Sequence, residues 1–139
     1  MEQLTRLRPA TILVVENEAI VLMELADWLA DIGLTVLTAF SADEAVDLLN
    51  THPEIGLLMT DITMPGSMDG VELAHLAHKS WPLVKIVVTS GKTDPDRDEL
   101  PAGSVFVPKP LERPRLWSVL SQLMGDDAAR PEPTSVLPV

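Results

Sequence analysis

Five short apolar runs without a polar face constrain the fold of this chain more than any other feature of its sequence. They lie at 12–15, 35–38, 57–60, 86–89 and 105–107. Apolar runs without alternation are typical of strands that are covered on both faces, and such strands belong to parallel sheets. The sequence therefore predicts a parallel sheet with helices on both sides.

Amphipathic stretches fill most of the gaps between these runs and predict helices. Apolar residues recur at three- and four-residue spacing up to Gly33, which lies where a helix commonly ends. Ser41 and Glu44 have the spacing of a capping box and predict the start of a second helix. A third helix is expected from about Asp69 and a last one over 112–124. Strands that alternate with helices indicate an α/β fold with right-handed crossovers.

The gap between the fourth and fifth apolar runs departs from this pattern. Residues 92–104 contain two prolines, a glycine and five charged residues besides Lys92. Proline lacks an N–H and glycine favours turns, so we expect the fourth helix to be short or disordered and most of this segment to be mobile. The chain therefore divides into an N-terminal extension at 1–9, one domain at 10–124 and a disordered tail at 125–139.

The composition excludes several classes of function. The 139 residues include 10 Lys and Arg against 21 Asp and Glu, a formal net charge of −11. That charge repels phosphate backbones, so nucleic acid is not expected as a partner. The absence of cysteine excludes disulfides, thiolate nucleophiles and cysteine-ligated zinc. The apolar runs are far shorter than the roughly 20 residues that span a bilayer, and the N-terminus lacks the apolar stretch of a signal peptide. We therefore expect a cytoplasmic domain that binds no membrane.

Polar side chains follow the expected strands at the points where these strands end. Glu16 and Asn17 follow the first strand, Asp61 the third, Thr89 ends the fourth, and Lys109 follows the fifth. The carboxyl ends of parallel strands meet at one edge of the sheet, so we expect these side chains to lie close together. Oxygen ligands suit Mg²⁺, and a carboxylate can attack phosphorus to form an aspartyl phosphate. The ammonium and the hydroxyl would then neutralise the transferred phosphoryl oxygens.

In these segments the sequence resembles the receiver domains of two-component response regulators. The matching segments are VVENE at 14–18, TDITMPGSMDG at 60–70, VVTSG at 87–91 and FVPKP at 106–110. All four occur in order at expected strand ends, and the resemblance covers roughly residues 10 to 124. It implies a flavodoxin-like, doubly wound sheet of five parallel strands in the order 2-1-3-4-5. This strand order follows from the resemblance alone.

The resemblance also implies a phosphoacceptor and a metal site. Asp61 would accept the phosphoryl group. Glu16 and Asn17 occupy the positions of the family's acidic pair and would hold Mg²⁺ together with Asp61, directly or through water. Thr63, two residues after the acceptor, would offer its backbone carbonyl to the same ion.

Three further residues have roles that the resemblance implies. Thr89 would be the switch hydroxyl that moves toward the phosphoryl group, and Lys109 would bind a phosphoryl oxygen. Phe106 occupies the position of the aromatic residue whose rotamer reports activation. The bond between Lys109 and Pro110 lies where the family has a cis peptide.

The resemblance leaves more than one function open. The leading hypothesis is a single-domain response regulator, which is not an enzyme, takes phosphate from a histidine kinase or phosphotransfer protein, and signals to an unknown downstream protein or as a homodimer. Asn17 replaces the second acid of the family, so Mg²⁺ binding should be weaker. This departure favours an alternative, a degenerate receiver that acts as an unphosphorylated adaptor. The receiver part of a hybrid kinase is a further alternative. An aspartyl-phosphate phosphatase ranks below these because Thr63 replaces the second acid that such enzymes need.

Three apolar residues are candidates for partner docking. Ile20 and Met23 fall outside the main apolar stripe of the first helix, and Trp117 falls outside that of the last helix. Residues outside the stripe are either peripheral packing or an exposed patch beside the site. We therefore expect contact with the kinase to involve the first and last helices.

Overall fold

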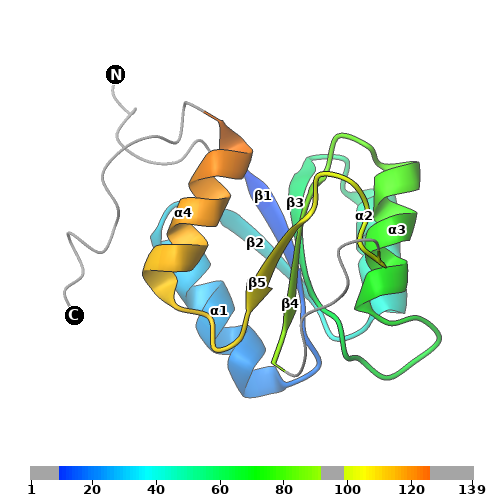
Figure 1. Ribbon diagram of the computed structural model, residues 1–139, viewed down its shortest axis with the longest axis horizontal. Coiled ribbons are helices and arrows are strands. Elements are labelled where there is room, and N and C mark those ends of the chain that lie inside the picture. Colours follow the sequence, from blue (N-terminus) through cyan, green and yellow to red (C-terminus); the bar gives the residue numbers. More distant parts are fainter. Residues whose placement is uncertain (1–9, 92–98, 126–139) are drawn as a thin grey trace.

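The computed structural model of the protein describes residues 10–91 and 99–125, and its centre is a sheet of five parallel strands. The strands are β1 (Thr11–Val15), β2 (Thr35–Ala39), β3 (Ile55–Asp61), β4 (Lys85–Ser90) and β5 (Val105–Pro108). Their order is β2-β1-β3-β4-β5, and every neighbouring pair is parallel (Figure 1). Both the parallel sheet and the order implied by the resemblance are confirmed.

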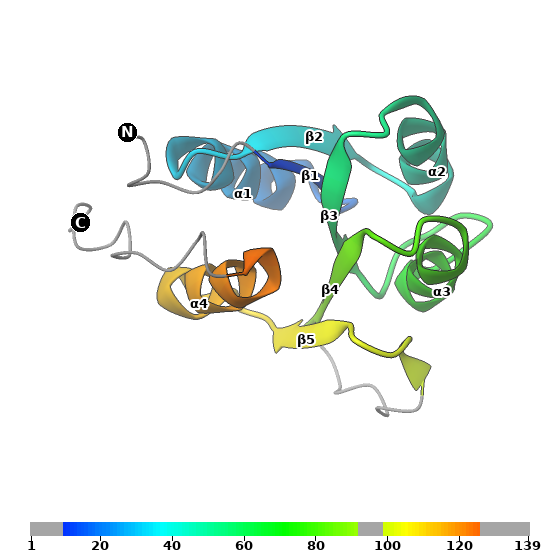
Figure 2. The same ribbon diagram turned by 90° about the horizontal axis from the view of Figure 1, so that it is seen from above.

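Within the described residues, four helices cover the two faces of this sheet. They are α1 (Ala19–Asp31), α2 (Ala42–Thr51), α3 (Gly70–Ser80) and α4 (Arg113–Met124). Figure 2 shows α1 and α4 side by side on one face and α2 and α3 on the other. The result is a three-layered α/β fold of the flavodoxin-like type. None of the described helices is long and apolar enough to cross a bilayer.

The surroundings of the interior strand β1 explain why its apolar run has no polar face. All five of its residues are buried. Ile12 and Val14 pack in the layer beneath α1 and α4, whereas Leu13 and Val15 pack in the layer beneath α2 and α3. Successive side chains of a strand point to opposite faces, so a strand between two helical layers needs an apolar residue at every position.

Local signals in the sequence position the helix ends. The Ser41 hydroxyl accepts a hydrogen bond from the Glu44 N–H at 3.1 Å at the start of α2. Asp69 and Glu72 form a reciprocal capping box at the start of α3, with both hydrogen bonds at 2.9 Å. Gly33 follows the end of α1 with a φ of 106°, a conformation that glycine adopts without strain. The starts of α2 and α3 and the end of α1 therefore agree with the sequence.

The exposure of Trp117 is predicted wrongly from the sequence. The side chain is only 3% exposed and packs with α1 against the sheet. Helix α4 lies beside α1 on the sheet and buries Leu116, Trp117 and Leu120 (Figure 2). Neighbouring helical residues point about 100° apart, so this helix buries two adjacent sides rather than one narrow stripe. Trp117 is therefore a core residue and is unavailable for docking.

The segment between β4 and β5 is described only at Gly91 and over residues 99–104. Residues 92–98 lie outside the described residues, so the expected mobility and the short or disordered helix stay predictions. Leu100 packs in the layer beneath α2 and α3. The Ser104 N–H donates to the Pro101 carbonyl at 3.2 Å, and this turn leads directly into β5. The expected extension at 1–9 and nearly all of the expected tail also lie outside the described residues.

Candidate functional site

The ends of β1, β3 and β5 bring two carboxylates and one ammonium together at one edge of the sheet. Lys109 Nζ lies 2.9 Å from Glu16 Oε1 and 3.3 Å from Asp61 Oδ2. The side chains of Glu16 and Asp61 are 5% and 10% exposed, and that of Lys109 is 22% exposed. A charged group held so far from water needs an opposite charge beside it, and here one ammonium serves both acids.

The backbone around Glu16 holds this carboxylate in place. The Glu16 N–H donates to the Ala39 carbonyl at 3.1 Å, which ties the end of β1 to β2. The Glu18 N–H donates to Glu16 Oε2 at 3.1 Å, while Oε1 accepts from Lys109. Both carboxylate oxygens of Glu16 are therefore engaged. The next residue, Asn17, is exposed at the same edge.

Asp61 ends β3, and its surroundings depend on a glycine, Gly70, whose role was not predicted from the sequence. The Gly70 N–H donates to the Ile62 carbonyl at 2.9 Å. A Cβ atom at Gly70 would collide with the Asp61 carbonyl oxygen. Only glycine lets the start of α3 approach the backbone of the acceptor strand so closely. The signal that could have revealed it is a glycine directly after the capping residue Asp69, where alanine would favour the helix more.

The remaining predicted site residues lie around these three charged groups. Thr89 is buried and pairs with Asp61 in the register of β3 and β4. The side chain of Thr63 is exposed, and its backbone hydrogen-bonds the Asp61 carboxylate. Phe106 is half-buried and packs in the layer beneath α2 and α3. The peptide between Lys109 and its following proline is cis. Of the residues predicted to act as phosphoacceptor, metal ligand or switch, all except Phe106 belong to the ends of strands or to the loops that follow them.

The surroundings of the site raise the pKa values of both Asp61 and Lys109. Burial raises the pKa of Asp61, the charge of Glu16 raises it further, and the ammonium of Lys109 offsets only part of this effect. Burial alone would lower the pKa of Lys109, but its contacts with Glu16 and Asp61 outweigh burial and raise it. The edge therefore holds an acid whose charge is incompletely compensated, which is a suitable environment for an added cation.

The donor set at this edge fits a magnesium ion. Within the described parts of the chain, no group of three or more His, Cys, Asp or Glu side chains comes together as a metal site. Magnesium is commonly bound by one or two carboxylates, keeps several waters and also contacts a phosphate. Glu16 and Asp61 supply two carboxylates, and Asn17 and the carbonyl of Thr63 are oxygen donors of the right type. The set contains no nitrogen or sulfur ligand that would favour zinc.

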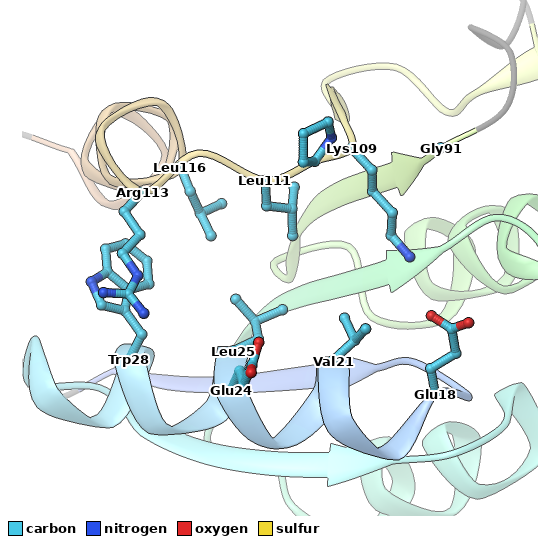
Figure 3. Close-up of a pocket in the computed structure, with 11 residues that line it drawn as sticks. Glu18, Val21, Glu24, Leu25, Trp28, Gly91, Lys109, Leu111, Arg113 and Leu116 are labelled. Atoms are coloured by element: carbon cyan, nitrogen blue, oxygen red, sulfur yellow. The ribbon is translucent and has the colours of Figure 1, made fainter.

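A cavity of about 530 Å³ opens beside the charged groups, between α1 and the connection from β5 to α4. Glu18 and Lys109 lie at one end of it (Figure 3). Trp28 lies at the other end, where the Arg113 guanidinium stands 5.9 Å from the centre of the indole ring. Val21 and Leu25 form the apolar wall between these ends. The edge of the site thus continues into a partly apolar groove along α1.

The exposed apolar residues of α1 agree with the sequence. Ile20 is 72% exposed and Met23 is 63% exposed, both near the start of the helix that follows Glu16. Since Trp117 is buried, the predicted docking surface reduces to these two residues of α1.

Comparisons with known proteins identify the family to which this fold and site belong. The family model of the response regulator receiver domain matches residues 12–121. The chain belongs to the response regulator receiver domain family. Members of this family are signalling domains of two-component systems, and phosphorylation on aspartate is characteristic of them.

Individual relatives include a kinase, a transcriptional regulator and a receiver protein. The chain is 32% identical over 119 residues to the sensor kinase CckA of Brucella abortus, which covers 83% of this chain and 12% of the relative. It is 39% identical over 87 residues to the hydrogenase transcriptional regulatory protein HoxA of Cupriavidus necator, over 63% of this chain and 17% of the relative. The crystal structure of a response regulator receiver protein from Sinorhizobium medicae matches with a TM-score of 0.79 and 28% identity, over 86% of this chain and 98% of that one. The chain thus spans only a small part of the two curated relatives.

Proposed function

We propose that this receiver domain accepts a phosphoryl group on Asp61 from a histidine kinase or phosphotransfer protein, in a reaction that depends on Mg²⁺, and signals by changed contacts with other proteins. The observation that carries the proposal is the Lys109 ammonium, which contacts Asp61 and Glu16 together at the carboxyl edge of the sheet. An ammonium beside a buried carboxylate is placed to receive the charge that arrives with a phosphoryl group.

The chemistry assigns one task to each group. A carboxylate oxygen of Asp61 attacks phosphorus, the new O–P bond forms as the P–N bond to the donor histidine breaks, and the leaving nitrogen keeps its electron pair and takes a proton. Lys109 then shifts its contact from the Asp61 carboxylate to a phosphoryl oxygen, and the hydroxyl of Thr89 offers a second donor. Mg²⁺ would be held by Glu16, Asn17, Asp61 and the carbonyl of Thr63. When bound, this ion supplies positive charge to the oxygens of the transferred group.

Replacement of the acceptor tests this proposal. Asp61→Asn keeps the size of the side chain and removes the nucleophile, so incubation with acetyl phosphate and Mg²⁺ should leave no acid-labile phosphate on the protein. Asp47→Asn, at an exposed position of α2, is the matched control and should be labelled like the wild type. Intact-mass measurement reads both results. Labelling of the Asp61 variant to the wild-type level would overturn the assignment.

A second function, an adaptor that works without phosphorylation, is favoured by one observation. Asn17 leaves two carboxylates where the resemblance leads us to expect three. If the wild-type chain takes up no phosphate and shows no spectral change with beryllium fluoride and Mg²⁺, the adaptor replaces the phosphoacceptor as the function.

The proposal includes a single-domain regulator that acts in the cytoplasm. The identity with the sensor kinase CckA favours the other arrangement, in which the chain is the receiver part of a longer hybrid kinase. The mass of the native protein, measured by immunoblot of the source cells, distinguishes the two. A band near 15.1 kDa agrees with a single domain, whereas a much larger band shows a longer protein.

A further inference from the structure

We propose that Glu18 strengthens the binding of a divalent cation at Glu16 and Asp61 by supplying the negative charge that Asn17 does not. This inference rests on the proposed metal site and gives Glu18 a role that the resemblance does not imply. Glu18 is a positioning residue in this account, because it acts through the electric field rather than as a ligand.

The side chain of Glu18 is on the side of the site. It lines the cavity that also contains Lys109. Figure 3 shows its carboxylate turned toward the Lys109 ammonium from the opposite side of this cavity. The side chain is exposed, so its charge is retained without the cost of burial.

The backbone of Glu18 is tied to the site as well. Its N–H donates to Glu16 Oε2 at 3.1 Å. This hydrogen bond holds the Cα atom of Glu18 next to a predicted metal ligand, so the position of the side chain is coupled to that of Glu16. A glutamate elsewhere on α1 has no such connection in the described structure.

A local structural role does not account for this residue. Glu18 is the N-cap of α1, a position where Ser, Thr, Asp and Asn are preferred because their short side chains accept hydrogen bonds from the first turn. The Glu18 side chain makes no such capping bond. What it does for the helix is limited to a favourable interaction with the helix dipole, which affects stability and not cation binding.

The balance of charge supports a role in cation binding. Glu16 and Asp61 carry two negative charges, and Lys109 cancels one of them. A divalent cation would therefore leave this group with one positive charge, and the carboxylate of Glu18 would restore neutrality. Since no three acids of the described chain come together as a metal site, Glu18 acts from outside the coordination sphere. The number of charges around an oxygen site tunes its affinity even so.

The experiment measures Mg²⁺ affinity by calorimetric titration of three variants, without any phosphorylation. Glu18→Gln should weaken Mg²⁺ binding about threefold at low salt. Glu24→Gln is the matched control, since Glu24 is exposed and lines the same cavity six residues further along α1. That spacing places it about 9 Å further along the helix axis, so its effect on affinity should be much smaller. Glu18→Asp keeps the charge and should restore most of the affinity.

Salt provides a second readout that a structural role would not move. The Debye length falls from about 30 Å at 0.01 M to about 3 Å at 1 M ionic strength. The difference between Glu18→Gln and the wild type should therefore shrink toward zero at 1 M NaCl. A wild-type affinity in Glu18→Gln, or an equal loss in Glu24→Gln, would overturn the inference.

The failure of this inference is distinguishable from that of the proposed function. Glu16→Gln and Asp61→Asn remove predicted ligands and should abolish or greatly weaken Mg²⁺ binding. If they do and Glu18→Gln does not weaken it, the metal site stands and only the role of Glu18 is wrong. If neither of them weakens binding, the metal site itself is wrong and the inference falls with it.

Discussion

Asp61 is the residue whose ionisation should make the stability of the protein depend most clearly on pH. Its native pKa is raised above the ordinary value of 3.8, mainly by burial. The native state therefore holds the proton more tightly than the unfolded chain, so the stabilising contribution is present below pH 3.8 and is lost as the pH rises through the native pKa. At neutral pH the ionised carboxylate destabilises the fold. Asp61→Asn should raise the melting temperature at pH 7 by roughly 2 to 5 °C.

The control for this prediction is the pH profile itself. The gain in melting temperature from Asp61→Asn should diminish from pH 7 toward pH 4, where the wild-type carboxyl takes up its proton. Thermal unfolding followed by circular dichroism across that range measures it. A gain that is constant with pH, or a loss of stability at pH 7, would show that the charge of Asp61 is not what destabilises the site.

Asn17 is the other residue whose charge can be tested directly. Asn17→Asp adds a third carboxylate at the edge of the sheet, so Mg²⁺ affinity should rise about three- to tenfold. The same charge adds repulsion in the metal-free protein, and its melting temperature without Mg²⁺ should fall slightly. Asn50→Asp, at an exposed position of α2, adds an equal charge elsewhere and should leave the affinity unchanged. Equal or weaker Mg²⁺ binding by the Asn17 variant contradicts the prediction.

At the scale of elements, the junction of β3 and α3 is the most sensitive to a change of one methyl group. Gly70→Ala should destabilise the protein by about 1 to 3 kcal/mol, since the new Cβ collides with the Asp61 carbonyl and the start of α3 must move. Alanine would otherwise favour the helix by about 1 kcal/mol. Urea unfolding measures the difference in free energy.

A second glycine provides the comparison for that element. Gly56→Ala, in β3, adds a methyl group where nothing lies within 4 Å and should change the stability little. The shift of the Asp61 backbone in Gly70→Ala should also slow phosphorylation by acetyl phosphate, whereas Gly56→Ala should not. If Gly70→Ala is as stable as the wild type, the close approach of α3 to β3 does not require glycine at position 70.

At the scale of the whole molecule, two edges expose large apolar side chains, but only one of them adjoins the site. Met23 lies on α1 beside the carboxyl edge of the sheet, and Leu83 lies between α3 and β4 at the opposite edge. If the kinase docks on α1, Met23→Glu should slow phosphotransfer from the kinase about tenfold and leave labelling by acetyl phosphate unchanged. Leu83→Glu is the control and should leave both rates unchanged, because Leu83 is 89% exposed and far from the site.

A comparison of the two rates distinguishes a docking defect from damage to the site. If Met23→Glu changes neither rate, α1 is not the docking surface. If both rates fall together, the substitution disturbs the site itself, and the docking assignment is wrong as well. Only a selective loss of transfer from the kinase supports the exposed face of α1 as the contact.

The layers of the fold and the edge of the sheet where the site lies are predictable from the sequence alone. Apolar runs such as 12–15 predict buried parallel strands because each side chain of such a strand faces an apolar layer. Capping signals at Ser41 and Asp69 depend on residues three positions apart, so they are readable without the tertiary structure. The ends of parallel strands share one edge, which is why Asp61 and Lys109 could be placed together in advance. The strand order required the resemblance to a known family.

The contacts between elements that are distant in the sequence became evident from the three-dimensional structure. Trp117 is buried because α4 lies beside α1, a contact that the periodicity of one helix does not reveal. The need for glycine at position 70 arises from the passage of α3 past the end of β3. The pKa of Asp61 is raised mainly by burial, which follows from the packing of the whole fold. Its contact with Lys109 joins residues that are 48 positions apart in the sequence. Packing and electrostatic contacts act through space between distant residues, so the local sequence patterns that predict strands and helix caps do not reveal these contacts.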